Sequence, residues 1–128
     1  MKLLFVSIGL LGLLAVALTM NVVRLRRKKR ISLGDGGDKE TLAAIRAHAN
    51  FMEFVPLGLI LILTVMNLYS GPIAGILAAA LVVCRLLHAG GMLGFVGQGR
   101  FLGAAGTVLV FVVASILVIL GALGGKPF

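Results

Sequence analysis

Three polar residues with helical spacing, Arg46, Asn50 and Glu53, interrupt a long apolar stretch of the chain. Positions i, i+4 and i+7 fall on one face of a helix, so these side chains would form a polar stripe. A charge at the centre of a membrane helix costs about 2.5–3.5 kcal/mol, so charges there usually have partners or a function. Either Arg46 and Glu53 neutralise each other while Asn50 bridges helices, or the stripe binds a polar ligand.

The rest of the chain has the composition of a membrane protein. Of its 128 residues, 60% are hydrophobic and 12% are charged, whereas soluble proteins contain about 25% charged residues. Four apolar stretches approach the ~20 residues that cross a bilayer. We therefore predict an all-α integral membrane four-helix bundle, with Asp38 as the N-cap of its second helix. The predicted single domain covers residues 1–128, with helices at about 3–23, 39–67, 72–88 and 101–123.

The basic residues are concentrated after the first apolar stretch, where Arg and Lys fill all but one position from 24 to 30. By the positive-inside rule, this cluster predicts an inner-membrane protein whose first and third connections are cytoplasmic and whose termini are both periplasmic. The cluster would also attract anionic membrane lipid. No stacking aromatic residues accompany it, which argues against a nucleic-acid partner. Cys84 is the only cysteine, so the sequence predicts neither a disulfide nor a metal site.

This orientation brings further cations toward the polar stripe. The second helix enters from the cytoplasm, so Glu53 would lie about 10 Å deeper than Arg46 at ~1.5 Å per residue. Arg85 and His88 are near the cytoplasmic end of the third helix, and Arg100 opens the fourth. Several cations around one carboxylate repel each other unless an anion joins them. We therefore predict that the polar stripe and these three residues form a site for an anionic ligand.

The segment from Arg46 to Pro56 resembles the R-x-x-x-N-x-x-E-(Y/F)-x-P signature of the MAPEG family, the membrane-associated proteins in eicosanoid and glutathione metabolism. The glycine-rich segment 34–37 and the arginine cluster before it are similar to the small bacterial branch of this family. The similarity covers nearly the whole chain. It implies a homotrimer that binds glutathione between adjacent subunits near the cytoplasmic side. It also implies that the glutathione thiolate attacks a lipophilic electrophile.

The resemblance also implies roles for individual residues. Glu53 would contact the amino group of glutathione, and arginines such as Arg46 would contact its two carboxylates. An arginine of the neighbouring subunit would join them, at the position of Arg26 or Arg27. Arg100 would be catalytic, because a neighbouring cation lowers the pKa of a thiol and favours the reactive thiolate. The expected glutathione-binding residues are Arg26, Arg27, Arg46, Asn50, Glu53, Arg85 and His88.

The sequence departs from the family pattern at three aromatic positions. His88 and Met92 stand where transferases of the family often carry tyrosines, and Phe54 replaces another frequent tyrosine. These departures leave open a non-catalytic glutathione- or anion-binding scaffold of the same fold. A small multidrug transporter would need a carboxylate in its first helix, and residues 3–23 contain none. We favour a membrane-bound glutathione-dependent transferase or peroxidase.

Overall fold

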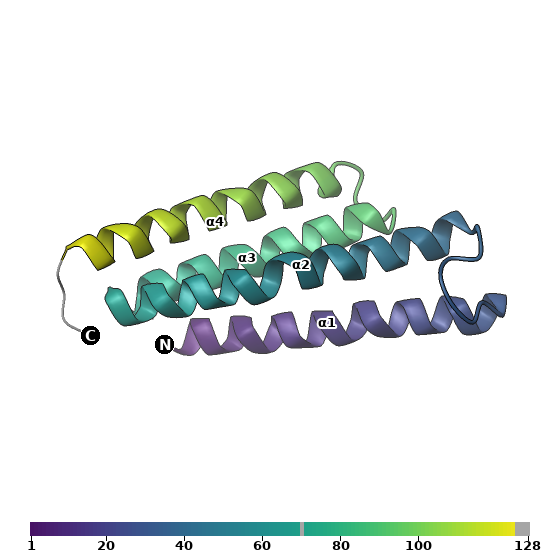
Figure 1. Cartoon of the computed structure of the whole chain (residues 1–128), viewed down its shortest axis with the longest axis horizontal. Helices are drawn as coiled ribbons and strands as arrows, with labels where there is room; N and C mark the ends of the chain where they lie inside the picture. The colour runs from purple at the N-terminus through teal and green to yellow at the C-terminus, as the bar shows by residue number, and fades with distance from the viewer. Residues whose placement is uncertain (70, 125–128) are drawn as a thin grey trace.

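The computed structural model describes residues 1–69 and 71–124, so residues 70 and 125–128 of the predicted domain lie outside the described part. Each helix in the described part is long and apolar enough to cross a membrane. The predicted all-α membrane four-helix bundle is therefore confirmed. The start of α1 and the end of α4 lie at the same end of the bundle (Figure 1). The helices are α1 (Lys2–Lys29), α2 (Lys39–Leu68), α3 (Gly71–Met92) and α4 (Gly99–Leu123).

Helices α2 and α3 form the middle of the bundle, with α1 packed on one side of the pair and α4 on the other (Figure 1). Helix α1 buries a leucine at every seventh position, namely Leu4, Leu11, Leu18 and Leu25. A seven-residue spacing keeps side chains on one stripe of a helix. The other large apolar side chains of α1 are mostly exposed, which suits a helix that faces lipid.

Two helices extend beyond their predicted ends. Helix α1 continues to Lys29 instead of ending near residue 23, because Lys and Arg are good helix formers and cations interact favourably with the C-terminal dipole. Helix α3 continues past His88 to Met92. It includes Gly91, whose backbone packs directly against that of Arg100. This packing offsets the low helix propensity of glycine. It also sets the position of Arg100 along the axis of α3.

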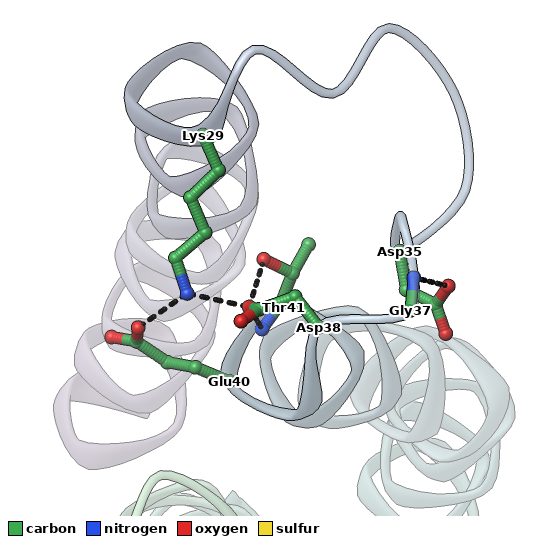
Figure 2. A network of polar contacts seen from close by, with 6 residues as sticks. All are labelled: Lys29, Asp35, Gly37, Asp38, Glu40 and Thr41. Atoms are coloured by element: carbon green, nitrogen blue, oxygen red, sulfur yellow. Dashed lines mark hydrogen bonds and ion pairs between the residues drawn. The ribbon is translucent and has the colours of Figure 1, made fainter.

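A polar network fixes the start of α2 to the end of α1 (Figure 2). Lys29 Nζ donates to Asp38 Oδ2 at 2.5 Å and to Glu40 Oε2 at 2.6 Å. Asp38 Oδ2 also accepts hydrogen bonds from the backbone N–H of Thr41 at 2.8 Å and from its hydroxyl at 2.7 Å. Asp38 is therefore the N-cap of α2, as predicted. The network fixes the first turn of α2 against α1, and the polar stripe of α2 is positioned from this turn.

We predict that Asp38 makes the stability of the protein depend on acid pH. Hydrogen bonds from Lys29 and Thr41 lower the pKa of Asp38 from 3.8 to about 2. Because the folded-state pKa is depressed, the stabilisation is complete above about pH 4 and is lost as the pH falls through about 2. The variant Asp38→Asn keeps a capping oxygen but loses the charge. Its midpoint of thermal unfolding should lie below that of wild type at pH 5, and the gap should close at pH 2.

Circular dichroism at a series of pH values measures this difference directly. Other carboxyl groups titrate over the same range, but they do so in both proteins, so the gap between the two midpoints isolates Asp38. A gap that stays constant from pH 5 to pH 2 would contradict the assigned ion pair.

Candidate functional site

A buried arginine of α3 connects three helices. The side chain of Arg85 is only 2% exposed. Its Nη1 donates to Asn50 Oδ1 of α2 at 2.8 Å, and its Nη2 donates to the carbonyl oxygen of Gly103 of α4 at 3.3 Å. The guanidinium also lies 5.6 Å from the ring centroid of Phe54. Within residues 1–69 and 71–124 no carboxylate pairs with Arg85, and its Nε has no hydrogen-bond partner. Arg85 is therefore a buried cation held by neutral groups.

The contact with Arg85 fixes the orientation of the Asn50 amide. A guanidinium can only donate, so the oxygen of Asn50 must face it and the NH₂ group is available to the neighbouring cavity. That cavity has a volume of about 570 Å³ and lies between α2, α3 and α4. It carries a cation and several hydrogen-bond donors but no carboxylate, which suits an anionic ligand. It is lined by Asn50, His88, Gly97, Gln98, Arg100, Phe101 and Ala104.

A second cavity adjoins the first through a shared residue. Its volume is about 310 Å³, and Arg100 lines both cavities. Arg46 and Lys39 are the other cations of its wall, and no carboxylate is among the lining residues. The complete lining is Lys39, Leu42, Ala43, Arg46, Gly91, Met92 and Arg100. The structure thus places Arg46, Asn50, His88 and Arg100 on the walls of two adjoining cavities, with Arg85 bound to Asn50.

The two ends of the predicted stripe on α2 face outward. Arg46 Nη2 and Glu53 Oε1 are 3.8 Å apart, and their side chains are 53% and 54% exposed. In water an exposed pair of this kind contributes about 0–1 kcal/mol, but a charge costs more where a helix faces lipid, so mutual neutralisation is one structural reason for these two residues. Glu53 lies within a helix long and apolar enough to cross a membrane. A carboxylate exposed in such a helix needs a polar partner.

Arg26 and Arg27 lie away from both cavities within one subunit. Arg26 Nε donates to the carbonyl oxygen of Gly34 at 3.1 Å, and its side chain lines a cavity of about 230 Å³ with His48 on the other side of α2. Arg27 lines a further cavity with Arg30. Helix α1 does not touch α4 in the described part of the chain. A contact between these two arginines and glutathione therefore requires a neighbouring copy and stays a prediction.

Three polar or aromatic residues of the cavity walls were not identified from the sequence: Lys39, Gln98 and Phe101. Lys39 is seven residues before Arg46, so the helical spacing of the polar stripe could have identified it. Gln98 lies within a glycine-rich segment and Phe101 follows it, and no pattern in that segment sets which of its residues face α2. Phe101 is 72% exposed while it lines the larger cavity. It therefore forms an apolar edge of that cavity at the surface of the bundle.

Comparison with known proteins identifies the family of the chain. The family model of the MAPEG family matches residues 4–120, a range that contains every residue of both cavities. The chain is also similar to Inner membrane protein YecN of Escherichia coli K12 and of Escherichia coli O6:H1, with 37% identity over 78 residues in each case. Each alignment covers 60% of this chain and 60% of the relative's length. On the extent of the family match, the chain belongs to the MAPEG family.

Proposed function

We propose that this protein is a membrane-bound glutathione-dependent transferase or peroxidase, in which the glutathione thiolate attacks a lipophilic electrophile. The observation that carries the proposal is the pair of adjoining cavities that share Arg100. Their walls contain three cations and several neutral donors but no carboxylate. Glutathione has two carboxylates and an ionisable thiol, so it supplies the negative charges that these walls lack.

The residues present fit the groups of glutathione. Arg46 and Lys39 are suited to its carboxylates, because cationic donors form the strongest hydrogen bonds to carboxylate oxygens. The thiol would lie beside Arg100, whose charge lowers the pKa of the thiol and raises the fraction of thiolate. Arginine keeps its charge in a site of low dielectric, so this effect persists away from water. The exposed, apolar Phe101 gives an electrophile dissolved in the membrane a route to the sulfur.

We further propose that the working protein is a homotrimer in the inner membrane, with periplasmic termini and a cytoplasmic active site. The outward-facing Arg46 and Glu53 support an assembly, because a neighbouring copy would cover a carboxylate that otherwise faces lipid. Glu53 would then contact the amino group of glutathione. Arg26 or Arg27 of the neighbouring copy would reach the same ligand, since neither approaches the cavities of its own subunit. The basic cluster supports this orientation by the positive-inside rule.

Calorimetric titration of glutathione into the detergent-solubilised protein tests the proposal. We expect saturable binding by wild type and a loss of at least about tenfold to hundredfold in affinity for Arg100→Ala, because hydrogen bonds to charged groups contribute about 1.5–3 kcal/mol. Lys28→Ala is the matched control. It removes one positive charge from the same end of the bundle at an exposed residue that lines neither cavity, so its affinity should match that of wild type.

Two results would contradict the proposal. A folded wild type that does not bind glutathione would exclude glutathione as its substrate. Equal affinities of Arg100→Ala and Lys28→Ala would show that the two cavities are not the glutathione site.

The second candidate function is a non-catalytic glutathione- or anion-binding scaffold. The observation that favours it is the absence of tyrosine from the cavity walls, where His88 and Met92 stand instead. The two candidates differ in turnover alone. Wild type that binds glutathione but reacts neither with 1-chloro-2,4-dinitrobenzene nor with cumene hydroperoxide would establish the scaffold.

A further inference from the structure

His88 presents an unpaired imidazole to the cavity that contains Arg100. Its side chain is 6% exposed and lines the larger cavity. Neither ring nitrogen forms a hydrogen bond with any residue in the ranges 1–69 and 71–124. Buried polar side chains almost always have a hydrogen-bond partner. The partner of His88 is therefore expected inside the cavity, where the ligand would lie.

The position of His88 is fixed by the packing of α3 against α4. Gly103 lies so close to the backbone of His88 that a side chain at position 103 would collide with it. The imidazole is thus attached to a rigid segment of α3, on the wall of the cavity that also carries Asn50 and Arg100. Rigid placement of this kind is what a group that reacts with a bound substrate requires.

His88 is also the one side chain of this cavity wall that exchanges a proton near neutral pH. The amides of Asn50 and Gln98 carry no proton that they exchange in this range, and a guanidinium serves as a donor only. Imidazole is the side-chain group suited both to accept and to donate a proton near neutral pH. The nearby charged groups are Arg85 on α3 and Arg100 on α4. They stabilise a thiolate but cannot move its proton.

We infer that His88 is a catalytic proton shuttle, which accepts the proton of the bound thiol and returns it to the oxygen that leaves the electrophile. This role deepens the proposed function and rests on it. It also selects among electrophiles. A substrate that releases an oxyanion needs the returned proton, whereas one that releases a halide does not. The preferred substrates are therefore electrophiles that generate an oxyanion, such as hydroperoxides.

The reaction with a hydroperoxide consumes two thiols and forms an alcohol, a disulfide and water. His88 takes the thiol proton, and the thiolate sulfur attacks the terminal oxygen of the hydroperoxide. A sulfur–oxygen bond forms, the oxygen–oxygen bond breaks, and its electron pair leaves with the alkoxide. His88 gives its proton to this alkoxide, which becomes an alcohol. The sulfur is oxidised to a sulfenic acid and the peroxide is reduced. A second thiol then displaces hydroxide from the sulfenic acid to give a disulfide and water.

The test compares two electrophiles on the same variant. His88→Gln keeps the size and polarity of the side chain but cannot transfer a proton. With cumene hydroperoxide, kcat should fall by about 10²–10⁴-fold, the usual contribution of general acid–base catalysis. With 1-chloro-2,4-dinitrobenzene, which releases chloride, the fall should be at least about tenfold smaller. A series of hydroperoxides whose alcohols differ in acidity gives a second readout. The rate of the variant should depend on this acidity more steeply than that of wild type.

Each outcome bears on one of the two proposals. Equal losses with both electrophiles, or no loss with either, overturn the shuttle, because a structural or binding role affects both reactions alike. Wild type that binds glutathione but reduces no hydroperoxide also overturns the shuttle and leaves glutathione binding in place. Wild type that binds no glutathione overturns the proposed function, and the shuttle with it.

Discussion

Replacement of Arg85 by methionine is expected to leave the bundle folded and at least as stable, yet to weaken glutathione binding by roughly tenfold to hundredfold. A buried charge with no opposite charge beside it is a poor source of stability, because its desolvation offsets its hydrogen bonds. Replacement of buried ionic groups by apolar residues of similar volume is often neutral or stabilising by about 1–4 kcal/mol. The two hydrogen-bond acceptors of Arg85 also find other partners in the variant. The carbonyl oxygen of Gly103 keeps its 2.7 Å hydrogen bond from the Thr107 hydroxyl, and the half-buried Asn50 can turn toward its cavity.

Binding is expected to weaken for two separate reasons. Arg85 contributes positive charge near the larger cavity, and its hydrogen bond fixes which end of the Asn50 amide faces that cavity. Without Arg85 the amide can rotate and present its oxygen to an anion. Calorimetry measures the affinity for glutathione. Unfolding in a denaturing detergent, followed by circular dichroism, measures the stability of the same preparation.

Arg85→Lys is the matched variant, since it keeps the charge but loses the planar fork that reaches two acceptors. It should bind glutathione more tightly than Arg85→Met. If Arg85→Met lost helicity, Arg85 would be shown to hold the bundle together. If Arg85→Met bound glutathione as wild type does, the buried charge would have no part in ligand binding.

The amino-acid sequence predicts the helices of this protein well, because their apolar lengths match a bilayer and little else explains them. It also predicts the cap at Asp38, which is a local interaction within four residues. The ends of α1 and α3 were predicted less well. Cations continue α1 to Lys29 after the apolar residues have ended, and close packing of Gly91 against the backbone of α4 accompanies the extra turn of α3. Neither effect leaves a periodic pattern in the sequence.

The sequence predicts which residues belong to the candidate site, but it does not predict which of them contact each other. Helical spacing places Arg46, Asn50 and Glu53 on one face of α2. The choice of partner depends on how α2 and α3 are rotated about their axes. This rotation directs Asn50 to Arg85 and leaves Arg46 and Glu53 exposed. The proposed contact between subunits depends on the geometry of a second copy, which neither one sequence nor one copy of the bundle contains.

Substitution of Gly103 by alanine is expected to destabilise the bundle more than most single-methyl changes would. A Cβ atom at position 103 would collide with the backbone of Cys84 and His88, and backbone of a packed helix cannot move aside as a flexible side chain can. Over-packing of a well-packed interior costs about 1–3 kcal/mol. The same collision would push α4 away from α3, lengthen the hydrogen bond from Arg85 to Gly103 and change the shape of the cavity. Both stability and glutathione affinity should therefore fall.

Two other glycines provide graded controls for the same substitution. A Cβ at Gly106 would meet only the side chain of Cys84, which can rotate, and a Cβ at Gly12 of α1 would meet nothing within 4 Å. Gly12→Ala should be neutral or slightly stabilising, since alanine is favoured over glycine in helices by about 1 kcal/mol. Unfolding in a denaturing detergent should rank the proteins Gly12→Ala, Gly106→Ala, Gly103→Ala in falling stability. If Gly103→Ala were as stable as Gly12→Ala, α4 would have to sit further from α3 than described. Arg85 would then lack its contact with α4, and His88 would lose the packing that holds it at the cavity wall.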